Sequence, residues 1–105
     1  MTVVSVVYFG KLRELLGVKS EKLFVDEGAT VMDLLVSLIP KRHPGASGAW
    51  VATVFRKVKD EAAQDTSSVP VLGDYIVTLN GRSSSLWERL KEGDEVAVMP
   101  PFGGG

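Results

Sequence analysis

The residues with the clearest potential for chemistry stand at the end of the chain, in the hexapeptide PPFGGG at 100–105. Terminal glycines contribute no side chain to a core and lose the most backbone entropy on ordering, so they suit a narrow site where a Cβ would clash. Pro100 and Pro101 each fix φ and lack an N–H, so they end a preceding strand and stiffen its exit. Six extended residues reach roughly 20 Å, enough to carry the Gly105 carboxylate into another protein's active site. The alternative is a disordered end or a cloning remnant.

The chemistry open to this tail is that of its terminal carboxylate. A carboxylate at neutral pH is a poor electrophile, but an acyl-adenylate carries a good leaving group that sulfide or an amine can replace. This is covalent group carriage, in which the activating chemistry belongs to a partner enzyme. The sequence therefore predicts a carrier without a self-contained active site, and whether it counts as an enzyme stays open.

The other side chains that could do chemistry are better explained by structural roles. His43 is the only histidine and the chain has no cysteine, so we expect a solvated loop histidine and no metal site. The serines at 83–85 have no identifiable base nearby and fit turn and capping chemistry. Trp50 and Trp87 are expected in the core or in an interface.

Composition narrows the class of protein further. The chain has 105 residues, a formal net charge of −1 and no cysteine. Such a charge balance gives no reason to expect nucleic acid or an anionic membrane as a partner. No apolar run approaches the length of a membrane span, and the first residues do not have the pattern of a secretory signal. We expect a cytoplasmic protein that stably binds no cofactor.

Four strands are expected to position the tail, over residues 3–9, 21–25, 75–79 and 95–99. The first is β-branched and aromatic almost throughout, which predicts a central strand with little water on either face. The second is shorter and more polar, as is typical of an edge strand. The pair Asn80-Gly81 predicts a tight turn after the third, and 91–94 a turn before the last. Residues 64–73 are expected to form an irregular connection.

Helical spacing marks three further segments. Lys11 to Leu16 predicts a short helix that stops at Gly17. Apolar residues spaced i, i+3, i+4, i+7 and i+8 predict a helix over 31–39, capped by Thr30 with Asp33 and ended at Ile39 by Pro40. After a loop at 43–48, similar spacing predicts a second amphipathic helix over 48–63, and a single turn is expected over 86–90.

These elements predict an α+β fold of the β-grasp, or ubiquitin-like, type. Its mixed four- to five-stranded sheet would carry one main helix across one face, with the last strand beside the first. The whole chain, 1–105, would form a single domain with 100–105 as an extended flexible tail. In the last strand Ala97 and Met99 share the face opposite Val96 and Val98. We expect the face that does not meet the helix to continue into Phe102 as an exposed apolar surface that docks partners.

Several motifs resemble one family in their order along the chain. VVYFGKLRELLG at 6–17, GATVMDLL at 28–35, LNG at 79–81, LKEGDEV at 90–96 and the Pro-Pro to Gly-Gly ending resemble MoaD-type small subunits of molybdopterin synthase. The resemblance covers most of the chain except about residues 46–73, where this sequence is longer than compact members.

The resemblance implies a function and partners. The final glycine of such subunits is adenylated by a MoeB-type adenylyltransferase that uses ATP, and it then becomes a thiocarboxylate. The tail inserts into a MoaE-type large subunit, where its sulfur builds the dithiolene of molybdopterin. Carried over, Gly105 would bear the sulfur, while Gly104 and Gly103 would thread the partner's channel. A partner-binding surface would be formed by Phe102, Pro101, Pro100, Met99 and Ala97.

Three other functions stay open. Thiamine-type sulfur carriers share the fold and the diglycine end but usually lack the Pro-Pro pair. Archaeal ubiquitin-like modifiers resemble the same sequence and attach their final glycine to lysines of other proteins. An interaction module with an incidental tail is the third. The sequence does not distinguish a molybdenum from a tungsten pathway.

Overall fold

The computed structural model describes residues 2–56, 75–100 and the backbone of 71–72. In chain order, strand β1 (Thr2–Tyr8) leads through helix α1 (Lys11–Leu16) to strand β2 (Ser20–Val25). A helix follows in three segments, α2 (Val31–Asp33), the π-helical η1 (Leu34–Leu38) and α3 (Ile39–Arg42). The 3₁₀ turn η2 (Pro44–Ala46) and helix α4 (Ser47–Val54) come next, and the remaining elements are strands β3 (Phe55–Arg56), β4 (Val71–Leu72), β5 (Ile76–Leu79), β6 (Arg82–Ser83) and β7 (Glu95–Met99).

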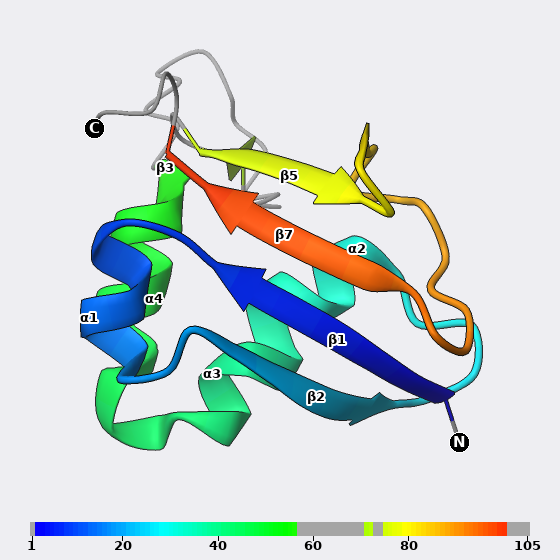
Figure 1. Ribbon diagram of the computed structural model, residues 1–105. Helices are drawn as coiled ribbons and strands as arrows, with labels where there is room; N and C mark the ends of the chain where they lie inside the picture. Colours follow the sequence, from blue (N-terminus) through cyan, green and yellow to red (C-terminus); the bar gives the residue numbers. More distant parts are fainter. Residues whose placement is uncertain (1, 57–70, 73–74, 101–105) are drawn as a thin grey trace, which may run out of the picture.

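Five of these strands form one mixed sheet in the order β2-β1-β7-β5-β6 (Figure 1). β7 runs parallel to β1 and antiparallel to β5, while β2 and β6 are antiparallel additions at the two edges. The last strand thus lies beside the first, as expected. This sheet with its helix packed across one face is the β-grasp fold, so the predicted fold class is confirmed.

β1 is central, but its two faces differ. Its even-numbered residues are buried and its odd-numbered residues are only half-buried. The expectation of little water on either face was wrong, because the helices cover one face of the sheet and leave the other open (Figure 1). Because Val3 and Val7 are apolar, the sequence predicts burial on both faces of the strand, although these two residues line the open face.

The main helix begins as predicted and ends later. Thr30 Oγ1 accepts the Asp33 N–H, and the Asp33 carboxylate accepts the Thr30 N–H, which completes a capping box. The dihedral angles at Leu38 and Ile39 stay helical, and the chain continues through Pro40 to Arg42. The prediction that Pro40 ends the helix at Ile39 was therefore wrong.

The π-helical segment and Trp50 explain how the helix tolerates this proline. The Ile39 N–H bonds the Leu34 carbonyl, five residues back. In the same register residue 40 would donate to the Leu35 carbonyl, but proline has no N–H to give. Trp50 Nε1 donates to that carbonyl instead at 2.8 Å. The indole of α4 thus replaces the missing backbone hydrogen bond, and Trp50 is fully buried as expected of a core residue.

The segment after the main helix differs from the prediction. The expected loop at 43–48 contains η2, and α4 begins within it at Ser47. α4 ends at Val54, because Phe55 is extended and Phe55–Arg56 pair with Val71–Leu72. The helix predicted over 48–63 is therefore wrong at Phe55–Arg56, and its residues 57–63 lie outside the described part. The irregular connection predicted over 64–73 is likewise wrong at Val71–Leu72. β-branched residues such as Val51 and Val54 fit strands as well as helices, which weakened the pattern.

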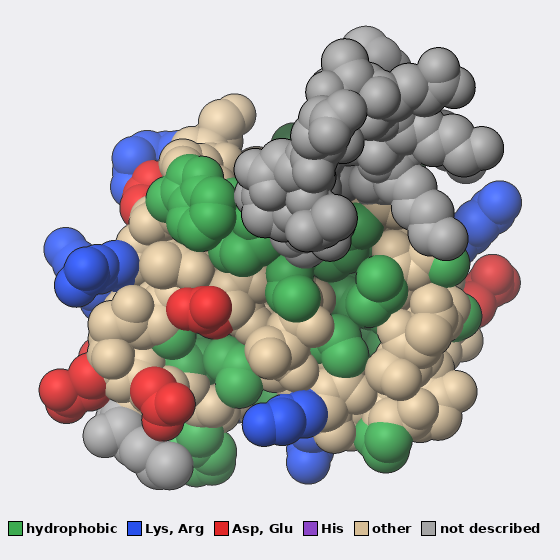
Figure 2. Space-filling view, turned by 180° about the vertical axis from the view of Figure 1, so that it is seen from behind, with side chains coloured by type: hydrophobic (Ala, Val, Ile, Leu, Met, Phe, Trp, Pro, Cys, Tyr) green, Lys and Arg blue, Asp and Glu red, His purple; other side chains and the backbone are tan. Residues whose placement is uncertain are grey.

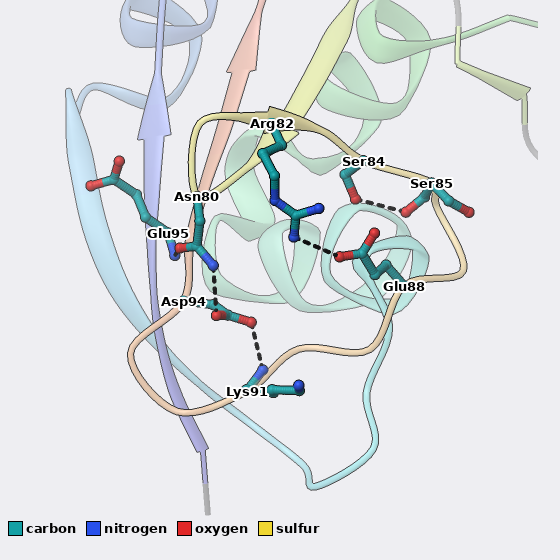
Figure 3. Close-up of polar contacts among 8 residues, drawn as sticks. All are labelled: Asn80, Arg82, Ser84, Ser85, Glu88, Lys91, Asp94 and Glu95. Atoms are coloured by element: carbon teal, nitrogen blue, oxygen red, sulfur yellow. Dashed lines mark hydrogen bonds and ion pairs between the residues drawn. The ribbon is translucent and has the colours of Figure 1, made fainter.

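The turns that precede β7 anchor its start (Figure 3). Asn80 and Gly81 form the predicted hairpin turn between β5 and β6. Asn80 Nδ2 donates to Asp94 Oδ1 at 2.9 Å, and Asn80 Oδ1 accepts the Glu95 N–H at 2.9 Å. Asp94 also accepts the Lys91 N–H within the predicted tight turn. These contacts hold the first residue of β7 in register with β5 and so decide which face each later residue presents.

Candidate functional site at the exit of the C-terminal tail

β7 delivers the tail from the middle of the sheet. Its neighbours β1 and β5 bond it on both sides, and Val96 and Val98 are fully buried against the helices. Pro100, the last described residue, follows directly. Phe102, Pro101 and the three glycines, which the sequence assigns to partner binding and sulfur transfer, lie outside the described residues. The structure therefore defines the root of the tail and its surroundings.

Pro100 packs on the turn between β1 and α1. A Cβ built on Gly10 would lie 3.3 Å from Pro100 Cγ, and Gly10 has a φ of 60°. The neighbouring Phe9 N–H donates to the Val98 carbonyl at 3.2 Å, which extends the β1–β7 pairing to the exit. Only glycine fits this turn without strain while leaving room for the proline ring. Gly10 of the sequence motif FGKLRELLG therefore leaves the space in which the Pro100 ring packs.

An apolar surface surrounds this exit on the open face of the sheet. We call it the exit patch, and it comprises Val7, Phe9, Ile76, Ala97 and Met99. Ala97 lies between Val7 and the neighbouring Thr78, and Met99 lies opposite Ile76. Ile76 is 43% exposed, and the other four are half-buried. Ala97 and Met99 thus lie on the face away from the helix, while Val96 and Val98 are core.

Sequence reasoning did not include Val7, Phe9 and Ile76 in this surface. Their neighbours on β7 depend on the parallel β1–β7 register and on the β5–β7 register, which pair residues far apart in the chain. The alternation of side chains along each strand shows which residues share a face. It does not show which strands are neighbours in the sheet. Arg13 covers the Phe9 ring at 5.2 Å and donates to the Tyr8 carbonyl, so one cation borders the patch.

His43 is not the solvated loop residue that was expected. Its Nε2 lies 2.6 Å from Glu21 Oε2, and its side chain is only 17% exposed. The hydroxyl of Tyr8 donates to the same oxygen at 2.6 Å, and Arg42 Nε lies 3.6 Å from the other carboxylate oxygen. Burial, together with the hydrogen bond to Glu21 and its negative charge, raises the pKa of the Tyr8 phenol well above its ordinary value.

This cluster is structural in its geometry. It joins the end of the main helix to β2 and β1, and the Tyr8 ring also meets Trp50 edge to face with centroids 5.8 Å apart. The expectation for His43 failed because only cysteine and histidine were considered as partners, whereas folding supplies a carboxylate from a strand 22 residues away.

The described residues contain neither a cluster of metal ligands nor a membrane-spanning helix. Within 2–56 and 75–100 no three histidine, aspartate or glutamate side chains come together as metal ligands. No helix among the described residues is long and apolar enough to cross a membrane. On the face shown in Figure 2 acidic and basic side chains are interspersed rather than gathered in one field.

The fold and the tail exit together define a class, the β-grasp proteins that extend a glycine-rich C-terminus from a central strand. The ThiS family model matches residues 6–105. The molybdopterin synthase sulfur carrier subunit of Chlamydomonas reinhardtii is 31% identical over 97% of this chain and 98% of its own length. Small archaeal modifier protein 3 of Haloferax volcanii is 34% identical over 93% of this chain and 94% of its own.

A solved structure agrees with the sequence matches. The crystal structure of H. volcanii small archaeal modifier protein 1 superposes with a TM-score of 0.70 at 27% identity, covering 97% of this chain and 100% of that one. The chain belongs to the ThiS family, and it is similar both to molybdopterin synthase sulfur carrier subunits and to small archaeal modifier proteins.

Proposed function

We propose that this protein is the sulfur-carrier small subunit of a molybdopterin synthase, with the carboxylate of Gly105 as its working group. The observation that carries this proposal is the central strand β7, which leads through Pro100 into the sequence Pro-Phe-Gly-Gly-Gly. A buried, doubly paired strand gives the tail a rigid root, and the exit patch beside it offers a partner an apolar surface. The similarity to a molybdopterin synthase sulfur carrier subunit supports the same function.

The proposed chemistry takes place in two steps within a partner. A carboxylate oxygen of Gly105 attacks the α-phosphorus of ATP, so that pyrophosphate leaves and an acyl-adenylate forms. Hydrosulfide then attacks the acyl carbon, AMP leaves with its bonding electron pair, the proton of the sulfur passes to solvent, and a thiocarboxylate remains. No described side chain of this chain is required for either step, since the adenylyltransferase supplies the catalytic groups.

Two partners follow from this proposal. A MoeB-type adenylyltransferase would bind ATP and activate Gly105, and a MoaE-type large subunit would receive the sulfur for the molybdopterin dithiolene. Both would have to seat the tail in a channel narrow enough to require Gly103 and Gly104. We propose that both dock on the exit patch, because its apolar side chains lie where the tail leaves the sheet.

The sulfur-loading reaction tests the working group directly. The protein is incubated with ATP, magnesium, the adenylyltransferase and a sulfur donor, and intact mass reports exchange of one oxygen for sulfur. Deleting Gly105 moves the carboxylate back by about 3.5 Å, which is more than near-attack geometry tolerates. Appending one alanine places a methyl group in the channel. We expect both variants to keep the parent's thermal midpoint and to lose loading; loading at the parent's rate would refute the proposal.

A separate test addresses the exit patch. Met99→Asp and Ala97→Asp place a charge on the half-buried outer face, while Ser37→Asp adds the same charge at an exposed position of the main helix, on the other side of the sheet. We expect the first two to weaken adenylyltransferase binding by about tenfold or more, as desolvated charges do in interfaces, and the control to leave it unchanged. Loss of folding in both patch variants would show that these residues act as core.

Protein conjugation is the second candidate function, and the similarity to small archaeal modifier proteins favours it. In that reaction a lysine amine replaces AMP, and an isopeptide bond joins Gly105 to another protein. A modifier should appear in high-mass adducts that survive boiling in detergent, and trypsin should leave diglycine remnants on the acceptor lysines. A dedicated sulfur carrier should instead accumulate as free protein or in complex with its large subunit.

A further inference from the structure

The edge of the sheet at β2 carries backbone groups that no strand among the described residues pairs. The Tyr8 N–H donates to the Lys19 carbonyl, so in this antiparallel ladder Glu21, Leu23 and Val25 also direct their N–H and C=O groups toward β1. The intervening residues Ser20, Lys22 and Phe24 direct theirs away from the sheet. No described strand pairs with β2 on this side. The edge therefore offers three residues with hydrogen-bonding groups aimed outward.

A groove of about 340 Å³ lies between this edge and the main helix. Leu23 and Leu38 form its apolar floor, and Phe24 borders it with a side chain that is 67% exposed. An extended peptide that pairs with β2 would place alternate side chains on this floor, as in strand-addition complexes. The groove lies at the edge of the sheet, with β1 between it and β7, and none of its lining residues belongs to the exit patch, so it is a different surface.

The groove is basic. Its remaining lining residues are Lys22, Lys41 and Arg42, and of these Arg42 also lies 3.6 Å from the Glu21 carboxylate. An adjoining hollow shares Leu38 and Lys41 and is lined by the carboxylates of Asp26, Glu27 and Asp33. The basic groove therefore lies beside β2, and the acidic hollow lies just past the last residue of this strand, Val25.

We propose that this groove is a second binding site, which takes an extended peptide with aliphatic residues and adjacent carboxylates. The peptide adds a sixth strand to the edge of the sheet by pairing with Ser20, Lys22 and Phe24. Its aliphatic side chains pack on Leu23 and Leu38, and its carboxylates lie at Lys41 and Arg42 on the helix side of the edge and at Lys22 on the other side. Backbone pairing supplies the affinity, while the floor and the basic side chains select the sequence.

The first test is amide hydrogen exchange measured by NMR on the full chain. The probe is the synthetic peptide acetyl-Val-Ile-Val-Ile-Asp-Asp-Asp-amide, and the control peptide carries lysines in place of the aspartates. Strand addition should slow exchange at the amides of Ser20, Lys22 and Phe24. Those of Glu21, Leu23 and Val25 already bond β1 and should change little. An alternating pattern of this kind is specific to a new strand and would not arise from side-chain contact alone.

The second test is affinity measured by fluorescence anisotropy with the same peptides. The double variant Lys22→Glu with Lys41→Glu should weaken binding of the acidic peptide at least about tenfold and should favour the lysine peptide. Lys91→Glu, an exposed lysine in the turn before β7, is the matched control and should leave the affinity within about twofold. Binding of the acidic peptide should also weaken as salt is added.

Three results would overturn the proposal. The first is no detectable binding of the acidic peptide to the folded chain. The second is equal binding by the double variant and Lys91→Glu. The third is a concentration-dependent dimer that protects Ser20, Lys22 and Phe24 without peptide, because a second copy would then occupy the edge. None of these measurements involves Gly105, so their outcome is independent of sulfur loading.

Discussion

Replacing Gly10 by alanine should strain the backbone locally and should also slow sulfur loading at Gly105. Gly10 has φ 60° and ψ −135°, a region that side-chain-bearing residues avoid at a cost of roughly 1–3 kcal/mol. The new Cβ would lie 3.3 Å from Pro100 Cγ, so the proline must move by a few tenths of an ångström. We therefore expect a loss of stability together with a displacement at the root of the tail.

The size of the functional effect follows from the lever arm. A shift of about 0.3 Å over one Cα spacing of about 3.8 Å tilts the chain by about 5°. Five further residues extend up to about 17 Å, so the carboxylate could be displaced by more than 1 Å. A misplacement of about 1 Å can cost about 100-fold in rate. Backbone rotation at three glycines can compensate for part of this displacement. We therefore expect sulfur loading to slow by about tenfold.

Gly17→Ala is the matched control. Gly17 also has a left-handed φ of 77°, but nothing lies within 4 Å of an added Cβ. Its strain should cost roughly 1–2 kcal/mol, and each kcal/mol lowers the midpoint of a domain this size by about 4–8 °C. Thermal unfolding and the kcat/KM for loading are measured on both variants at a temperature where both are folded. Equal loading by the two would refute the idea that the Gly10–Pro100 contact directs the tail.

Three other predictions concern the interior. Trp50→Phe should leave the buried Leu35 carbonyl without its donor and lower the free energy of unfolding in urea by roughly 1–3 kcal/mol. Adding Pro40→Ala restores a backbone N–H and should recover part of that loss. No recovery would contradict the inference that the Trp50 N–H replaces the N–H missing at Pro40. His43→Ala should destabilise by about 1–3 kcal/mol through its lost contact with Glu21, whereas a solvated histidine would change stability by less than about 0.5 kcal/mol. The raised pKa of Tyr8 favours the folded state fully below pH 10, and above it this contribution falls by up to about 1.4 kcal/mol per pH unit. Tyr8→Phe should therefore flatten the alkaline loss of stability, and an unchanged slope between pH 10 and 11 would exclude Tyr8 as its source.

Local patterns predicted most of the elements that lead to the tail. A nearly continuous apolar run marked β1 and another marked β7, the Thr30 and Asp33 pair marked the start of the main helix, and Asn80-Gly81 marked the hairpin. These signals depend on residues that are close together in the sequence. The covalent chain keeps such residues close in space whatever the rest of the fold does. The tail's chemistry was likewise open to inference, because Gly105 needs only a carboxylate and a lack of side chains around it.

Long-range packing overrode the local pattern at several positions. Pro40 carries a sequence signal for a helix end, yet the helix continues because Trp50 from another helix satisfies the exposed carbonyl. His43 has no local partner, and Glu21 reaches it only after β2 folds beside the end of α3. The apolar spacing after Trp50 fits a helix as well as a strand, and pairing of Phe55–Arg56 with Val71–Leu72 decides between them.

The sequence by itself determined which groups are chemically available and which strand carries them. The tertiary structure decided how they are displayed. Whether Ala97 and Met99 or Val96 and Val98 face outward depends on the face that the main helix covers, since both pairs are apolar. The patch also needs Phe9 and Ile76, which the sheet register brings to β7 from opposite ends of the chain. Strand alternation records two faces, but only packing against the helix makes one of them a surface.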